Sequence, residues 1–240
     1  MYGEGATILT GKSVVLLGSV MPYLRLAQLI FKRAGRSHYR IKKMRKRIIG
    51  LTGGIATGKS TVANYLAKTY DLPIFDADIY AREAVTLGSP ILQIILQRYG
   101  KEILLENGEL NRPQLGKIIF NNQEERLFIE SLIHPFVREK FIQEIAASTQ
   151  NTLVLVVPLL FEVKMTELVT EVWVVWCSQE KQLERLMQRN NLTLAEAQER
   201  INSQMPLSEK AALADVVLDN STSEDALFKQ IDKIIYSNLI

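Results

Sequence analysis

Two hydrophobic patterns alternate along the chain, and together they predict an α/β fold. Short apolar runs rich in β-branched residues are typical of buried strands; such runs occur at 48–51, 73–75, 152–160, 171–177 and 214–220. Between and after them, apolar positions recur with helical spacing at about 62–70, 79–87, 89–98, 112–120, 123–147, 178–189 and 222–237. Strands that alternate with helices form a parallel sheet sandwiched by helices.

The segment between the first expected strand and the first expected helix reads Gly53-x4-Gly58-Lys59-Ser60, which matches G-x-x-x-x-G-K-[ST]. Glycines let the backbone turn successive N–H groups toward one anion, and the following helix adds the positive end of its dipole. Lys59 can reach the β- and γ-phosphates, and the Ser60 hydroxyl can hold Mg²⁺. The pattern favours a nucleotide-phosphate site over a glycine-rich turn without a ligand.

A long helical segment, about 79–147, separates the second and third expected strands. Such an insertion forms a lobe above the carboxyl edge of the sheet, where open α/β sheets bind ligands. The arrangement is typical of a kinase with a small substrate. Within the insertion, Pro135 follows His134 and is expected to kink the helix, and a histidine at such a place is more often structural than functional.

Asp76 and Asp78 come at the end of the second expected strand, and Arg82 follows Asp78 by four residues. Because residues i and i+2 of a strand share a face, both carboxylates are predicted to face the phosphate site, where one can accept the proton of a hydroxyl nucleophile. Arg82 can then hold an anionic substrate group or a carboxylate. The structural alternative is an aspartate N-cap with an i,i+4 ion pair.

Arg185 and Arg189 are also spaced i,i+4, on the helix expected after the fourth strand. Two guanidinium groups on one helix face can neutralise charge on a migrating phosphoryl group. The alternative is a solvated face paired with Glu180 and Glu184. A polar segment, expected to be mobile, follows this helix.

The basicity of the chain lies in an N-terminal extension. Residues 1–47 contain eleven of the 29 basic residues but only Glu4 of the 26 acidic ones, which leaves 18 basic and 25 acidic residues for the body. Pro22 and Arg25 interrupt its apolar part, so no stable membrane insertion is expected. We expect residues 1–45 to be a poorly ordered extension or the result of an upstream start codon; a targeting segment or a basic patch for lipid or nucleic acid are alternatives.

Several other functions lack their characteristic residues. Two histidines are too few for a His-built metal site. The single cysteine, Cys177, cannot form an internal disulfide and is expected to be a buried thiol in a reducing compartment. No Asn-Lys-x-Asp guanine-reading motif occurs, and the run 152–160 lacks the terminal Asp of an ordinary ATPase magnesium site. Mg²⁺ is therefore expected on Ser60, phosphates and water, with Asp76 or Asp78 as a further ligand.

The residues alone indicate a kinase of a small hydroxyl-bearing substrate, and their motifs, in this order, resemble the dephospho-CoA kinases. The matching segments are GLTGGIATGKSTVA, FDADIYAR, LIHP, VVPLLFE, QLERLMQR and ADVVLDN. The resemblance covers about residues 46–236; Ala56-Thr57 stands where the family commonly has Gly-Ser. It implies a P-loop domain over 46–240, with a helical substrate lobe at about 79–147 and a lid at about 185–212.

The resemblance further implies ATP-dependent phosphorylation of the 3′-hydroxyl of dephospho-CoA, the last step of coenzyme A synthesis. It implies that Asp78 activates that hydroxyl, that Lys59 and Arg185 are catalytic, and that Arg82 and His134 lie in the substrate site. The implied nucleotide-binding residues are Gly53, Gly54, Ile55, Ala56, Thr57, Gly58, Lys59, Ser60, Thr61, Arg185 and Arg189.

We expect a cytoplasmic enzyme, a monomer or weak homo-oligomer, with ATP, Mg²⁺ and dephospho-CoA as ligands and no nucleic acid as partner. One rival interpretation is another small-molecule hydroxyl kinase. A second is a nucleic-acid-associated P-loop ATPase that uses the basic extension, although the acidic body argues against it.

Overall fold

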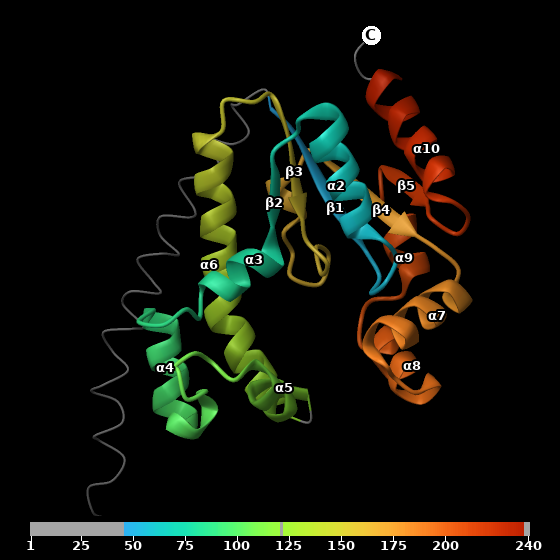
Figure 1. Cartoon of the computed structure of the whole chain (residues 1–240). Helices are drawn as coiled ribbons and strands as arrows, with labels where there is room; N and C mark the ends of the chain where they lie inside the picture. Colours follow the sequence, from blue (N-terminus) through green and yellow to red (C-terminus); the bar gives the residue numbers. More distant parts are fainter. Residues whose placement is uncertain (1–45, 121, 238–240) are drawn as a thin grey trace, which may run out of the picture.

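A five-stranded parallel sheet forms the centre of the protein, as the apolar runs predict (Figure 1). The computed structural model describes residues 46–120 and 122–237. The strands are β1 (Arg47–Gly53), β2 (Ile74–Asp76), β3 (Thr152–Val156), β4 (Glu171–Trp176) and β5 (Val216–Asp219), in the order β2-β3-β1-β4-β5. Leu51 of β1 pairs with Val156 on one side and Trp173 on the other. The phosphate loop therefore leaves the central strand at the ligand-binding edge of the sheet.

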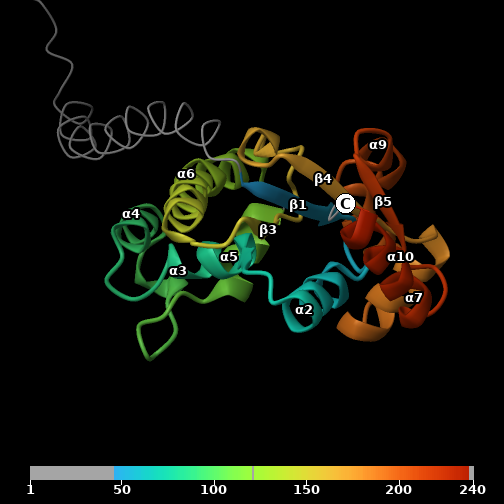
Figure 2. The ribbon, with the colours of Figure 1, turned by 90° about the horizontal axis from the view of Figure 1, so that it is seen from above.

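Helices cover both faces of the sheet (Figure 2). Alternation along β1 decides which face each of its side chains packs on. Ile49 and Leu51 pack on the side of α2 (Lys59–Tyr70) and α10 (Glu224–Ser237), whereas Ile48 packs on the side of α6 (Gln123–Ala147). Trp173 in the first core and Phe141 in the second are both fully buried. The predicted sandwich of helices around a parallel sheet is confirmed.

The residues between β2 and β3 form the predicted helical lobe at the carboxyl end of the sheet (Figure 1). It contains α3 (Ala77–Glu83), α4 (Pro90–Tyr99), the 3₁₀ turn η1 (Lys101–Ile103), α5 (Arg112–Phe120) and the first half of α6. The lobe has a core of its own, made of Ala84, Val85, Leu92, Ile95, Ile103, Leu110, Leu115 and Ile129. Ile133 of α6 packs against both this lobe core and the core on the α6 side of the sheet.

Two element boundaries differ from the predicted ones for local reasons. The helix expected at 79–87 begins at Ala77, because the Asp76 side chain accepts a hydrogen bond from the Asp78 N–H and caps it. It ends at Glu83, and the chain then turns through Gly88, whose φ is +82°. The run 152–160 is a strand only to Val156, because Pro158 lacks the N–H that a ladder needs.

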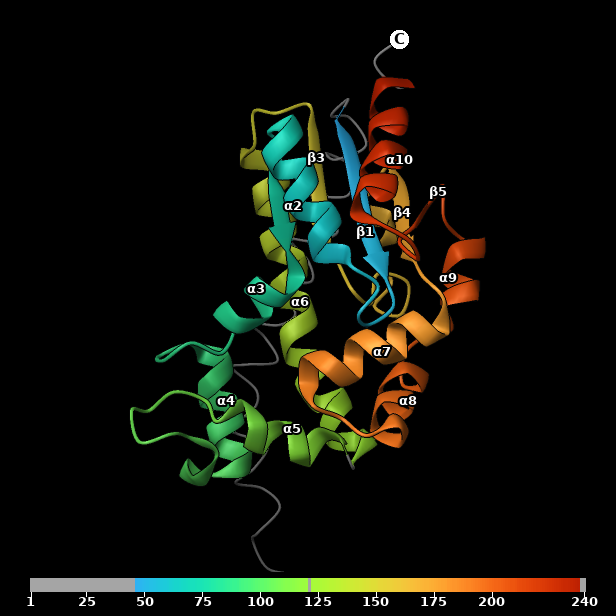
Figure 3. The same cartoon turned by 45° about the vertical axis from the view of Figure 1, so that its right-hand side comes forward.

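The polar segment after Arg189 is helical, and its expected mobility stays a prediction. α7 (Gln179–Asn190) is followed by α8 (Leu194–Asn202) and α9 (Leu207–Ala212). A capping box between Thr193 and Glu196 starts α8, and its spacing T-x-x-E is readable in the sequence. Figures 1 and 3 show α7 and α8 at the same end of the sheet as α4 and α5. We call the segment 179–212, which contains the lid predicted at about 185–212, the lid segment; movement of this segment as a lid stays a prediction.

The predictions for the basic extension concern residues 1–45, which lie outside the described residues, so they stay predictions. Among the helices of 46–120 and 122–237, none is both long enough and apolar enough to cross a bilayer.

Candidate active site

A cavity of about 910 Å³ opens at the carboxyl edge of the sheet, between the lobe and α7. Five residues of the predicted phosphate loop line it: Ile55, Ala56, Gly58, Lys59 and Ser60. The opposite walls contain four further predicted site residues: Asp78, His134, Arg185 and Arg189. Residues that are far apart in the sequence therefore meet around one space large enough for a small-molecule ligand.

The phosphate loop leaves several backbone donors without a partner. The N–H groups of Ala56, Gly58, Lys59 and Ser60 form no hydrogen bond within the described part of the chain. Left-handed φ values at Ala56 (+61°) and Gly58 (+100°) curl the chain before α2 begins at Lys59. Free donors at the positive end of a twelve-residue helix are suited to bind an anion.

The other predicted loop residues support the loop from behind and do not line the cavity. The hydroxyl of Thr57, which is buried, donates to the Gly54 carbonyl at 3.0 Å. A Cβ at Gly53 would lie 2.5 Å from the Val175 carbonyl oxygen, so only glycine fits there. The Thr61 N–H donates to the Gly58 carbonyl at 3.0 Å and belongs to the first turn of α2.

The Lys59 side chain folds back toward the start of the phosphate loop. Its Nζ donates to the carbonyl of Gly54 at 2.7 Å and to that of Gly53 at 3.2 Å. Burial, together with the nearby cations Lys210 and Arg189, lowers the pKa of Lys59 to about 8, against an opposing effect of Asp78 and Asp76. Because burial makes the charged form of Lys59 costly, binding of an anion beside its ammonium group is favoured.

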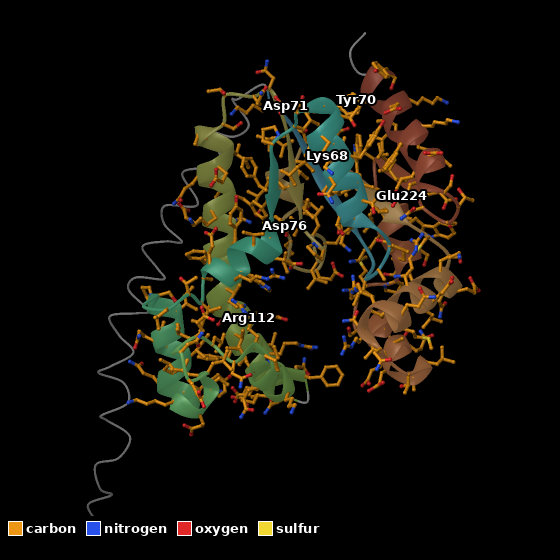
Figure 4. The ribbon with its side chains drawn as sticks, viewed as in Figure 1. Lys68, Tyr70, Asp71, Asp76, Arg112 and Glu224 are labelled. Carbon is orange, nitrogen blue, oxygen red and sulfur yellow. The ribbon has the colours of Figure 1, made fainter. Side chains whose placement is uncertain are left out.

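The two predicted carboxylates take different positions: Asp78 lines the cavity, whereas Asp76 caps α3 and still lies close enough to Lys59 to oppose the lowering of the Lys59 pKa. Figure 4 shows Asp76 at the junction of β2 and α3, where it caps the helix, and it does not line the cavity. Asp78 does line the cavity, because the chain enters a helix and the strand alternation no longer applies. Burial raises the pKa of Asp76.

Arg82 is exposed and is not among the cavity-lining residues, and no ion pair joins it to Asp78 in the described chain. Its backbone carbonyl accepts a hydrogen bond from Arg112 of α5 at 3.3 Å. The i,i+4 ion pair considered as the alternative is therefore also not formed. A role of Arg82 in substrate binding stays a prediction.

Arg185 and Arg189 both line the cavity from α7, as their spacing predicts. Arg185 Nη2 donates to the Asn220 carbonyl at 3.0 Å, while its buried Nη1 has no hydrogen-bond partner within the described residues. Arg189 Nε donates to the neighbouring Asn190 side chain at 2.9 Å. Among the described residues no ion pair joins either arginine to Glu180 or Glu184, and Glu184 pairs with Lys181.

Comparison with known proteins decides the family. The model of the dephospho-CoA kinase family (CoaE) matches residues 47–225. The chain belongs to the dephospho-CoA kinase family. The dephospho-CoA kinase of Nostoc sp. is 69% identical over 189 residues, which are 79% of this chain and 96% of the relative. That of Synechocystis sp. is 58% identical over 193 residues, 80% of this chain and 96% of the relative.

Solved structures agree with this family. The crystal structure of TT1252 from Thermus thermophilus is similar with a TM-score of 0.70 and 31% identity, and the match covers 81% of this chain and 98% of that one. A dephospho-CoA kinase from Campylobacter jejuni gives a TM-score of 0.55 and 27% identity over 80% of this chain and 97% of that one. The predicted family, the P-loop kinase fold and the enzyme class are confirmed.

In this dephospho-CoA kinase family member, the sequence did not predict a role for some residues near the cavity. Lys210 of α9 is fully buried, and its Nζ contacts Glu162 at 2.7 Å and the Pro158 carbonyl at 3.1 Å. Glu162 ends the VVPLLFE segment, so the ion pair joins the loop after β3 to the lid segment. Removing Glu162 would leave a buried charge on Lys210 without a carboxylate partner, which is energetically costly. The spacing of residues in the sequence does not indicate this ion pair.

Three side-chain amides hold the phosphate loop in roles that the sequence did not predict, although Gln182 and Asn220 lie in the matching segments QLERLMQR and ADVVLDN. Asn220 Nδ2 donates to the Thr57 carbonyl at 2.8 Å, and a Cβ at Gly58 would lie only 2.1 Å from that nitrogen. Gln182 and Gln204 contact the backbone of Ile55. His134, by contrast, was predicted and lines the cavity, where burial lowers the pKa of its imidazole and favours the neutral form.

Proposed function

We propose that this chain transfers the γ-phosphoryl group of ATP to the 3′-hydroxyl of dephospho-CoA, which yields coenzyme A. One observation carries the proposal: the four phosphate-loop residues whose backbone N–H groups form no hydrogen bond within the described residues line the same cavity as Asp78. The family assignment supports dephospho-CoA as the acceptor. A donor site for phosphate and an acceptor for a hydroxyl proton are the two parts that a small-molecule kinase needs.

The proposed roles follow from position in the cavity. Asp78 orients the 3′-hydroxyl and accepts its proton. The free N–H groups from Ala56 to Ser60, together with Lys59, hold the β- and γ-phosphates. Arg185 and Arg189 approach from α7 and stabilise the charge that spreads over the phosphoryl oxygens during transfer. His134, neutral and half-buried, contributes to the acceptor wall of the cavity.

Mg²⁺ fits the residues present, because the exposed Ser60 hydroxyl lines the cavity beside the loop. The described residues contain no cluster of three His, Cys, Asp or Glu side chains that could hold a metal alone. Ser60 would therefore hold Mg²⁺ together with phosphate oxygens and water, the mode that Mg²⁺ prefers. When bound, the ion supplies charge neutralisation on the phosphates.

We further propose a cytoplasmic enzyme, a monomer or weak homo-oligomer, that acts without nucleic acid. Its single cysteine, buried Cys177, supports a reducing compartment. Ultracentrifugation of the purified chain checks the oligomeric state.

The test is ATP consumption by the full chain with Mg²⁺, with and without dephospho-CoA, with the product identified by mass. We expect turnover that depends on dephospho-CoA and a product heavier by one phosphate. Adenosine and shikimate serve as control acceptors and should support no comparable turnover. ATP consumption that is indifferent to dephospho-CoA, or stimulated by RNA or DNA, would contradict the proposal.

A further inference from the structure

Ile55 lies between two peptide groups, and a glutamine from the lid segment holds each of them. The Ile55 N–H donates to Gln204 Oε1 at 2.9 Å, and the Ile55 carbonyl accepts from Gln182 Nε2 at 2.8 Å. Gln182 belongs to the first turns of α7 and is only 4% exposed, whereas Gln204 lies between α8 and α9. Both contacts lie far from the phosphate loop in sequence.

The Gln182 contact orients the amide that precedes Ala56. In a trans peptide group the C=O and the following N–H point in opposite directions. Holding the Ile55 carbonyl toward Gln182 therefore turns the Ala56 N–H away from Gln182. Ala56 lines the cavity, and its N–H forms no hydrogen bond within the described residues. A flipped peptide group would instead present the carbonyl oxygen where a phosphate needs a donor.

The Gln204 contact acts in the same way on the preceding peptide group. With the Ile55 N–H held by Gln204, the Gly54 carbonyl points the other way, and it accepts from Lys59 Nζ at 2.7 Å. The position of Gln204 is itself fixed, because the N–H of its neighbour Met205 donates to Glu162 Oε1 at 3.2 Å, and Glu162 pairs with buried Lys210. The loop is thus fastened to the lid segment on both sides of Ile55.

The close approach of Gln182 also explains why residue 54 is glycine, which the phosphate-loop pattern does not require. The pattern fixes Gly53 and Gly58 but leaves the second position open. A Cβ at Gly54 would lie 2.4 Å from Gln182 Nε2, so the glutamine can reach the Ile55 carbonyl only across a glycine.

We propose that Gln182 and Gln204 are positioning residues for phosphate binding: they fix the two peptide groups beside Ile55 so that the Ala56 N–H faces the nucleotide and the Gly54 carbonyl holds Lys59 at the cavity wall. The proposal rests on the nucleotide site of the proposed function but not on the identity of the acceptor.

The test compares Gln182→Met and Gln204→Met with Gln179→Met and Gln198→Met in the full chain. Methionine keeps the unbranched shape and removes the amide. Gln179 and Gln198 lie on the same helices α7 and α8 and bond to each other at 3.0 Å without touching the loop, so they are matched controls. Calorimetry measures Kd for ATP, ADP and adenosine, and thermal unfolding monitors the fold.

We expect each of the Gln182 and Gln204 variants to bind ATP and ADP about 10- to 100-fold more weakly, the range for one hydrogen bond to a charged group, with adenosine binding unchanged. The control variants should bind all three ligands like the wild type. Wild-type ATP affinity in both loop-contacting variants, or equal losses for ATP and adenosine, would overturn the proposal. If Gln182→Met does not fold, Gln204→Met, at a half-buried position, decides alone. A lack of dephospho-CoA turnover in the wild type would contradict the proposed function but not these binding constants.

Discussion

The sheet core on the α2 side and the lobe core bury their side chains equally well, yet they are assembled differently. Leu66 of α2 and Leu92 of α4 are both fully buried. The core around Leu66 draws residues from β1, β3, β4, β5 and α10, which are distant in sequence. The core around Leu92 comes from the contiguous stretch 84–129. One core therefore ties the whole chain together, whereas the other belongs to a local unit.

This difference teaches that the two halves of the site can be perturbed separately. The phosphate loop leaves the sheet core directly, since it follows β1 and precedes α2. The lobe is connected to the sheet through α3 and α6. Ile133 of α6 contacts both the lobe core and the core on the α6 side of the sheet. Pro135, also inside α6, removes one backbone hydrogen bond close to Ile133. Damage to the lobe core should reach the acceptor side of the cavity before it reaches the phosphate side.

The largest expected effect is a loss of turnover in Asp78→Asn without a loss of ATP binding. Asp78→Asn keeps the size of the side chain but cannot accept the hydroxyl proton, so turnover should fall about 10²- to 10⁴-fold. The Kd for ATP, measured by calorimetry, should stay near that of the wild type. Near-normal turnover would remove Asp78 from the mechanism, and Asp76→Asn, at a helix cap outside the cavity, is the control.

Leu66→Ala and Leu92→Ala are equivalent cavity-creating substitutions, one in each of the two cores. Each should cost about 2–5 kcal/mol, because both deletions leave a cavity at a fully buried site. For Leu92→Ala, hydrogen exchange should accelerate mainly within 84–136, the KM for dephospho-CoA should rise and ATP affinity should persist. Leu66→Ala should accelerate exchange across the sheet. Identical exchange patterns would show that the lobe is not a local unit.

A pH series tests the phosphate side alone. Burial, together with nearby cations, lowers the pKa of Lys59 to about 8, so the free protein loses this cation as pH rises through that value. ATP affinity should be full below about pH 7 and roughly tenfold weaker at pH 9, since one ionisation governs it. Adenosine, which has no phosphate, should bind equally at both pH values, and a flat ATP profile would contradict the assignment.

The smallest effect concerns one helix start in the lobe. The Ser89 hydroxyl accepts from the Leu92 N–H and donates to the Ala84 carbonyl, which caps α4. Ser89→Ala should cost about 1 kcal/mol in urea unfolding. ATP affinity should not change, and a change would mean that the lobe and the phosphate loop are coupled more tightly than their separate cores indicate.

Local pattern predicted most of the fold, because strand runs, turn residues and the phosphate-loop spacing act over a few neighbouring residues. Asp78 and Arg185 were also predicted from spacing, and both line the cavity. Asp76 and Asp78 take different positions because strand alternation does not continue into α3. The roles of residues that act across long sequence distances left no comparable signal. Gln182 and Gln204 resemble surface glutamines of a polar segment, and Lys210 resembles an exposed lysine, until the fold brings each to its partner.

The insertion point of the lobe has a consequence for how such a protein can change. The lobe leaves the sheet at Asp76 and returns at Thr152, on two strands that are hydrogen-bonded neighbours, with Asp76 paired to Val156. Asp78 and His134, the residues proposed for the acceptor side, therefore lie in one continuous segment that is inserted between two neighbouring strands. Recombination at those two points would exchange this segment and retain the phosphate loop, because strand β1 and the phosphate loop lie outside the exchanged stretch.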